Sequence, residues 1–458
     1  MGIKQVKLDV NEVIVGMYVS GLDRPWNQTP FPLQGFFVRD LDEIKLLRQL
    51  CQHVYIDAVR GRPPLTVERH ARTSPNTMRS RVSAREGRKK APANVKVAPL
   101  RIQRNQYPGV EPLKKEVKKA RQLHQNVYHA VGEVLDYLGR NELHRVPMLE
   151  TKRLAGDMVD SVLRNPDAFT WLSRVQEKDE HTYSHAIRSS VWAILFGRHI
   201  GLPKRDLDVL AMGVLLKDVG KIQLDQTLIA KPQRSPEEER EYETFVEKGV
   251  EILRRTPGVE PRVISVVKTH CERLNGSGFP LRLQGDKIPL LGKIAGVVTF
   301  YDNTTNPRGA QQPIAPSKAV SRLYELRDTQ FQEELVVEFI RAIGLYPTGT
   351  LVELSTGEVA VVVEQNFERR LKPKVLLVRD PVKELINPPE LLDLAEDDKH
   401  KQGLIDSGRQ NPEDIEKIEI ARDLEPGSYD VDITQVRDDY LMKKEASGIL
   451  NLLSKLKP

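Results

Sequence analysis

The sequence is poor in cysteine and has no long apolar run. Its 458 residues include two cysteines, Cys51 and Cys271, which lie far apart in the chain. They cannot form a disulfide framework or a zinc cluster of paired cysteines, and such sparse use fits a reducing compartment. The longest apolar runs, such as residues 191–197, are much shorter than the roughly 20 residues that span a bilayer. Because no charged-then-apolar leader opens the chain, the sequence predicts a cytoplasmic protein without a membrane span.

Negative charge and aromatic rings are scarce in residues 60–104, where 13 Lys and Arg accompany 2 Glu. This basic segment carries +11, which leaves −5 for the rest of a chain whose net charge is +6. It has no apolar period, so it cannot bury enough surface to fold alone. A basic tail can hold nucleic acid or anionic lipid by counterion release, but no ring is available here to stack on bases. Residues 60–110 are therefore predicted to form a flexible linker, with no specific nucleic-acid partner.

The pattern of apolar residues differs between the segments on either side of this linker, and it predicts a mainly α protein. Residues 1–59 contain short β-branched runs and one segment of helical period, which predicts a small N-terminal α+β domain. Residues 111–345 repeat apolar side chains with a helical period between Gly, Pro and Asn stops, which predicts a helical bundle. Residues 346–394 alternate around a Gly turn, which predicts a small β appendage made of a hairpin and a third strand. The polar residues 395–458 are predicted to be a poorly ordered tail.

Four short strings in the helical part place metal-ligand residue types at the ends of predicted helices. They are HTYSH at 181–185, KDVGK at 217–221, HCERLNGSGFP at 270–280 and VVTFYDNTTNPR at 297–308. In order and spacing they resemble the HD-GYP family of cyclic di-GMP phosphodiesterases, and residues 3–59 are similar to the small domain that often precedes such modules. The resemblance implies an HD-type helical bundle. In active members it also implies clustered iron or manganese ions, which activate a water and stabilise charge on the phosphoryl oxygens.

The resemblance assigns metal-ligand positions that this sequence fills only in part. Three ligands are retained as His185, Asp218 and His270. His181 lies four residues before His185 and could share a cation with it, and the Cys271 thiol is a further candidate. These five residues are interpreted as a vestigial metal site. A remodelled site for a single metal at the histidines and Asp218 remains open.

Other positions of the family pattern are substituted. Where the family has metal-binding histidines or carboxylates, this chain has the degenerate residues Lys217, Phe245, Asn275 and Thr299. An ammonium and a hydrocarbon ring have no lone pair to give a metal, so the remaining ligands are too few for a two-metal cluster. A buried Asp218 without a metal would be costly unless it were paired. We infer that Lys217 takes the place of a cation and pairs with Asp218.

The glycine loop, residues 272–280, keeps the family pattern better than the metal site does. Its interaction residues are Arg273, Gly276, Gly278, Phe279 and Pro280. The resemblance implies that family members meet diguanylate cyclases through this loop. It also assigns contacts with nucleotide phosphates to Lys221 and Arg308. Phosphate-binding charge is therefore expected to outlast catalysis.

The sequence predicts a catalytically degenerate HD-GYP protein that binds or contacts partners in bacterial cyclic di-GMP signalling, which affects motility and biofilm formation. No catalytic residue and no cofactor is expected. The enzyme alternative is a cyclic di-GMP phosphodiesterase with a reduced metal site, in which Asp218 and Lys221 serve catalysis and iron or manganese is the cofactor. A third hypothesis is a scaffold that binds no nucleotide and contacts diguanylate cyclases or other signalling proteins. Nucleotide binding separates the enzyme from the scaffold.

Overall fold

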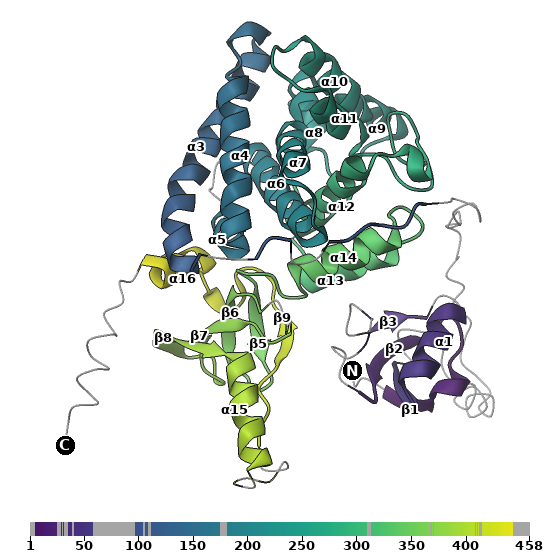
Figure 1. Cartoon of the computed structure of the whole chain (residues 1–458), viewed down its shortest axis with the longest axis vertical. Coiled ribbons are helices and arrows are strands. Elements are labelled where there is room, and N and C mark those ends of the chain that lie inside the picture. Colours follow the sequence, from purple (N-terminus) through teal and green to yellow (C-terminus); the bar gives the residue numbers. More distant parts are fainter. Residues whose placement is uncertain are drawn as a thin grey trace, which may run out of the picture. The chain divides into compact units, whose positions relative to one another are not determined.

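The computed structural model describes two compact units, one within residues 1–90 and one within residues 91–458 (Figure 1). The described residues are 5–24, 29, 31, 35–38, 41–57, 97–103, 106–108, 111–174, 181–308, 313–366, 369, 371–407, 409, 411 and 415–442. Most of the predicted linker, residues 60–96, therefore lies outside them. Within the described ranges, no helix has both the length and the apolar character needed to cross a membrane.

The first unit is a four-stranded antiparallel sheet with one helix, which confirms the predicted α+β composition. The sheet order is β1-β4-β2-β3, and the central strand β4 pairs with both β1 and β2. The helix α1 buries Ile44 and Leu47, and β4 buries Val54 and Ile56. The elements are β1 Gln5–Asp9, the 3-10 helix η1 Val10–Glu12, β2 Tyr18–Leu22, β3 Phe36–Phe37, α1 Leu41–Leu50 and β4 His53–Asp57.

The second unit begins with the predicted helical bundle, and its helices follow the apolar periods of the sequence. α6 and α7 are buried along most of their length and form its centre, while α3 and α4 pack alongside with one apolar face each. The helices are α3 Leu113–Gly139, α4 Met148–Arg164, α5 Pro166–Arg174, α6 His181–Ile200, α7 Lys204–Leu216, α8 Gln226–Ala230, α9 Pro236–Glu243, α10 Phe245–Arg255, α11 Pro261–Thr269, α12 Leu290–Thr305, α13 Pro316–Glu325 and α14 Glu333–Ile343, with the 3-10 helices η3 Leu143–Arg145, η4 Val219–Gln223 and η5 Gly285–Lys287.

The start of α9 illustrates how local sequence fixes a helix end. Ser235 accepts the backbone N–H of Glu238, and the Glu238 carboxylate accepts the backbone N–H of Ser235, so two otherwise unpaired N–H groups are satisfied. Pro236 occupies the first helical position, where the missing N–H costs nothing. The segment therefore turns sharply from the loop into α9, which covers one side of the candidate site described below.

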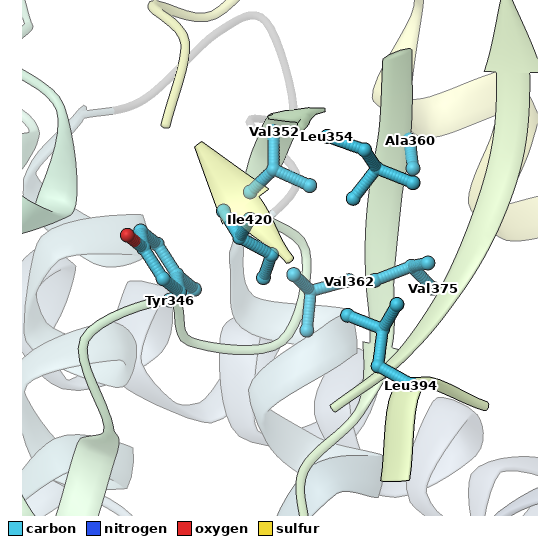
Figure 2. Packing of buried hydrophobic residues seen from close by; sticks show 8 residues of the cluster. All are labelled: Tyr346, Val352, Leu354, Ala360, Val362, Val375, Leu394 and Ile420. Atoms are coloured by element: carbon cyan, nitrogen blue, oxygen red, sulfur yellow. The ribbon is translucent and has the colours of Figure 1, made fainter. Parts of the chain in front are cut away.

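A five-stranded antiparallel sheet follows the bundle, in the order β8-β7-β6-β5-β9. Side chains from its strands gather with Tyr346 and Leu394 in one apolar cluster (Figure 2). The sheet is tied to the bundle by the Trp171 indole N–H of α5, which donates to the Val363 carbonyl at 2.7 Å. The elements are β5 Leu351–Leu354, β6 Val359–Glu364, β7 Lys374–Arg379, β8 Leu385–Asp393, α15 Leu394–Asp406, β9 Ile420–Asp423, the 3-10 helix η7 Ser428–Asp430 and α16 Ile433–Met442.

Two boundaries predicted from the sequence are wrong. The polar tail predicted from residue 395 contains α15, the edge strand β9 and α16, so the β appendage extends well beyond residue 394. The linker predicted to reach residue 110 ends earlier, because residues 97–103 are hydrogen-bonded to the helical part. The predicted tail is polar and residues 97–103 have no regular apolar period, so in both places the order comes from partners that are distant in the chain.

Candidate functional site

The candidate site lies where α6, the end of α7, the end of α11 and the middle of α12 meet. α6 supplies His185, and the turn from α7 into η4 supplies Lys217 and Asp218. His270 ends α11 at its C-cap, and Thr299 lies in α12. All five side chains are buried. The bundle therefore brings together residues that are up to 114 positions apart.

Asp302 of α12 organises this centre, although the sequence analysis did not single it out. Its carboxylate accepts hydrogen bonds from His185 Nδ1 at 2.5 Å, from Arg188 Nε at 3.1 Å and from Asn306 Nδ2 at 3.2 Å. Burial alone would raise the pKa of this carboxyl, but the charge of Arg188 and the contacts with His185 lower it. The signal was available in VVTFYDNTTNPR, because Asp302 lies one helical turn after Thr299 on the same side of α12.

The contact with Asp302 fixes the tautomer of His185. A carboxylate can only accept here, so Nδ1 carries the proton and Nε2 presents a lone pair. The Lys217 ammonium donates to that lone pair at 2.8 Å. Burial, together with the charge of Lys217, lowers the pKa of His185 to about 4. His185 is therefore neutral at pH 7, and both of its ring nitrogens are engaged.

The ion pair that the sequence predicts between Lys217 and Asp218 is present. The Lys217 side chain is fully buried and its ammonium donates to Asp218 Oδ2, while Lys221 Nζ lies 2.7 Å from Asp218 Oδ1. Burial lowers the pKa of Lys217, and Asp218 acts in the opposite direction. Burial would raise the pKa of Asp218, but the two ammonium groups hold it well below its ordinary value. Each oxygen of this carboxylate thus forms an ion pair with a lysine.

Phe245 packs beside His270, Phe279 and Lys221. Its ring packs edge-on against the rings of His270 and Phe279, and the Lys221 ammonium lies 4.8 Å from its centre. His270 Nδ1 donates to the Val267 carbonyl at 2.7 Å, so its Nε2 carries a lone pair. Among the described residues, neither this Nε2 nor the Thr299 hydroxyl has a hydrogen-bond partner. Burial lowers the pKa of His270 to about 3.

The donor set does not fit a two-metal cluster. The lone pair of His185 faces an ammonium rather than open space, and both Asp218 oxygens are in ion pairs. Phe245 offers no donor atom. Across the residues that the structure describes, no three His, Cys, Asp or Glu side chains are grouped so as to hold a metal ion. The His181 side chain lies outside the described residues.

The glycine loop is held by backbone hydrogen bonds rather than by the centre. The buried Glu272 carboxylate accepts the N–H groups of Leu281 at 2.8 Å and Leu283 at 2.9 Å. A side chain at Gly278 would place its Cβ 2.4 Å from the Cys271 carbonyl oxygen, so only glycine fits there. Arg273 donates to two backbone carbonyls and stacks over Phe331. These contacts fix Arg273, and they turn the loop between Gly276 and Pro280 back onto the bundle.

The remaining predicted residues border the centre. Asn275 accepts the Ser277 N–H within the glycine loop at 3.0 Å. Burial raises the pKa of Cys271 to about 12, so its thiol stays protonated and is a poor metal ligand. Burial acts to lower the pKa of Lys221, but Asp218 outweighs this and the pKa is raised, while the positive charge of Arg308 opposes the rise. The charge of Arg308 thus acts on Lys221 as a repulsion weaker than the attraction of Asp218.

Comparisons with known proteins agree with this architecture. Residues 173–335 match the family described as an HD domain, and residues 5–144 match a domain of unknown function called DUF3391. The chain is thus an HD-domain protein with a second recognised domain in front. The relatives given next are named cyclic di-GMP phosphodiesterases, which supports the resemblance of this chain to the HD-GYP family.

The relatives include a cyclic di-GMP phosphodiesterase of Pseudomonas aeruginosa, 26% identical over 85% of this chain and 89% of the relative. A cyclic di-GMP phosphodiesterase response regulator of Xanthomonas campestris is 28% identical over 42% of this chain and 51% of its own. Among solved structures, an HD-GYP-type protein of Bdellovibrio bacteriovorus matches with a TM-score of 0.43 and 14% identity, over 73% of this chain and 98% of that one.

Proposed function

We propose that this protein is a catalytically silent HD-GYP protein that acts as a binding or interaction module in bacterial cyclic di-GMP signalling. The observation that carries the proposal is the Lys217 ammonium, which hydrogen-bonds to both His185 Nε2 and Asp218. A metal ion at these two atoms would have to displace a buried cation. Because the ammonium has no lone pair, it cannot join the coordination sphere in its charged form.

The substitutions around Lys217 form a coherent set. A buried carboxylate needs a partner, and Asp218 receives one from Lys217 and another from Lys221. Phe245 and the neutral Thr299 replace donors without leaving an unmatched charge. This arrangement supports a centre that is stable without a metal.

Metal content and hydrolysis test this proposal directly. The purified protein is expected to hold well under one equivalent of iron, manganese or zinc, and to leave cyclic di-GMP intact when manganese or iron is added. The matched positive control is the triple variant Lys217→His, Phe245→His, Thr299→Asp, which restores the missing donors. We expect this variant to bind more metal than the parent. Two tightly bound metals in the parent, or turnover that Asp218→Ala abolishes, would contradict the proposal.

Residual phosphodiesterase activity is the second candidate, and one observation favours it. His270 keeps the tautomer of a metal ligand, with Nδ1 donating to a carbonyl and a buried Nε2 lone pair that lacks a partner among the described residues. A single metal at this nitrogen is the form in which activity would survive. Iron or manganese would then supply an activated water, and Lys221 and Arg308 would bind the phosphates. The hydrolysis assay separates this candidate from the first.

The proposed nucleotide contacts are Lys221 and Arg308, because both carry a positive charge suited to phosphate. The Lys221 side chain is 13% exposed, in contrast to the fully buried Lys217. The proposed protein partner is a diguanylate cyclase or another signalling protein that contacts the glycine loop. A protein that binds no nucleotide would be a scaffold alone.

A further inference from the structure

Residues 97–103, here called the strap, cross the helical part of the second unit in extended form. In Figure 1 this segment is the dark blue stretch that runs along α14 toward the end of α6. The N–H groups of Ala98 and Leu100 donate to side chains of the second unit. The Gln103 N–H donates to the Ile200 carbonyl at 3.0 Å. Pro99 favours the extended form, because proline disfavours helical backbone in the residue before it. The strap is thus a docked segment rather than a loose connection.

Three polar side chains hold the strap, and Lys293 of α12 links two of them. We call these four residues the clamp: Asp286 of η5, Lys293, Gln332 just before α14 and Glu334 of α14. Asp286 accepts the Ala98 N–H at 2.8 Å, and Glu334 accepts the Leu100 N–H at 2.7 Å. The Gln332 amide donates to the Ala98 carbonyl at 3.2 Å. All of these bonds go to main-chain atoms of the strap. The clamp therefore recognises an extended backbone, not particular side chains.

The clamp is connected within itself as well. Lys293 Nζ donates to Asp286 Oδ1 at 3.0 Å and to Gln332 Oε1 at 3.2 Å, and the Gln332 amide also donates to Glu334 at 3.2 Å. Two carboxylates accept backbone N–H groups, and hydrogen bonds to charged acceptors are stronger than neutral ones. Loss of one member is expected to weaken the others.

The same elements hold the glycine loop. Leu274 of the loop donates its N–H to the Gln330 carbonyl at 2.8 Å, and its carbonyl accepts the Gly285 N–H at 3.1 Å. Gly285 directly precedes the clamp residue Asp286, and Gln330 lies two residues before the clamp residue Gln332. The strap bridges these two places from outside. It is in a position to keep η5 and the start of α14 together. The two residues that hydrogen-bond to Leu274, Gly285 and Gln330, would then also keep their places.

We propose that the clamp is a docking site for an extended main chain, that the strap of this same chain fills it, and that the docked strap braces the glycine loop. The strap lies within the last part of the basic segment, residues 60–104, so this part of the segment contacts the elements that hold the loop. The family that matches residues 5–144 includes the strap, although the strap packs on the second unit. The inference stands whether or not the centre is catalytically silent, because it concerns only the backbone contacts of the strap.

Hydrogen–deuterium exchange on the full chain tests the brace from both sides. Leu100→Pro removes the N–H that Glu334 accepts and leaves every clamp residue intact. The double variant Asp286→Ala, Glu334→Ala removes the acceptors and leaves the strap intact. In both we expect roughly tenfold faster exchange in residues 101–103 and in the loop up to Gly285, in line with the loss of hydrogen bonds to charged acceptors. Exchange in α6 and α7 should not change.

Arg101→Ala is the matched control, because it alters an exposed side chain of the strap and none of its backbone bonds. It should exchange like the parent. Faster exchange of the strap without any change in the loop in Leu100→Pro would overturn the proposal, since the strap would then be a passive connection. A loop that loosens only in the clamp variant would overturn it as well, and so would strap exchange that matches the parent in both variants.

Discussion

The buried centre and the glycine loop are neighbours in the sequence, but each is stabilised by a different kind of interaction. The centre depends on charges that are matched in a dry interior: Lys217 and Lys221 on Asp218, and Arg188 on Asp302. The loop depends on one carboxylate, Glu272, that accepts backbone N–H groups. A change in the charges of the centre therefore leaves the hydrogen bonds of Glu272 in the loop in place. An interaction surface can outlast the metal site beside it.

Acidification should show the largest difference between the two regions, because the centre contains two buried neutral histidines and the glycine loop contains none. Unfolded histidines take up protons near pH 6.5, whereas burial lowers the pKa of His185 to about 4 and that of His270 to about 3. The unfolded state then binds more protons, so the free energy of unfolding falls as the pH drops through this window. We expect a loss on the order of 4 kcal/mol between pH 6.5 and pH 4, measured by urea unfolding at a series of pH values.

Burial also lowers the pKa of His124 on α3 to about 4, so His124→Gln removes a contribution from outside the centre. Most of the acid sensitivity should remain in that variant. A free energy of unfolding that does not change over this pH range would mean that the two histidines of the centre are protonated in the folded protein.

Removal of the Lys217 ammonium should be the most damaging single substitution in the centre. Lys217→Ala leaves the Asp218 carboxylate with Lys221 alone and opens a cavity, at an expected cost of about 3 kcal/mol in the free energy of unfolding. The control is the double variant Lys217→Met, Asp218→Asn, which removes both charges and keeps the volume, and should cost much less. Equal losses in the two would show that volume matters here and the ion pair does not.

The loop should respond to Glu272 instead. Glu272→Ala removes the acceptor for the N–H groups of Leu281 and Leu283, at an expected cost of about 2 kcal/mol. Glu272→Gln keeps one carbonyl oxygen and should lose less. Thermal unfolding measures the cost, and limited proteolysis within residues 276–284 measures loosening of the loop. If the histidines of the centre titrate differently in these variants, the two regions are not as independent as their contacts indicate.

Nucleotide affinity should show the smallest effects. Calorimetry with cyclic di-GMP is expected to give modest binding that weakens as salt is raised, with about a tenfold loss in Lys221→Ala and in Arg308→Ala. Arg308→Lys should recover only part of the loss, because a lysine cannot take two phosphate oxygens in one plane. The control is Arg240→Ala, an exposed arginine of α9. Tight binding that neither substitution at the site alters would place the nucleotide elsewhere.

The sequence predicted well wherever the signal was local. The helical periods located the bundle, and the β-branched runs located the strands of the first unit. The Lys217–Asp218 pair followed from a chemical argument, because an unmatched buried carboxylate is costly. Each of these inferences used residues that are close in sequence or a ligand pattern of fixed spacing.

The rest depended on partners that no local pattern reveals. The strand β9 has four residues and becomes a strand only by pairing with β5, 69 positions away for Arg422 and Glu353. The strap has no helical or strand period in its sequence, and its contacts with the clamp and with Ile200 give it order. Tertiary contacts decide both cases. Asp302 differs from them, because its position one turn after Thr299 is a local signal, but its hold on His185 depends on the contact between α6 and α12.

The last described helix, α16, returns to the first helix of the bundle. Arg121 of α3 pairs with Asp438 of α16 across 317 positions of sequence, and Lys114 lies over the Tyr440 ring. During synthesis, α3 leaves the ribosome roughly 15 to 60 s before its partner does, at 5–20 residues per second. Over that interval the face of α3 that α16 covers stays open, whereas the edge of β5 waits only about 3.5 to 14 s for β9, 69 positions later. The nascent chain therefore exposes this face of α3 for longer than the edge of β5.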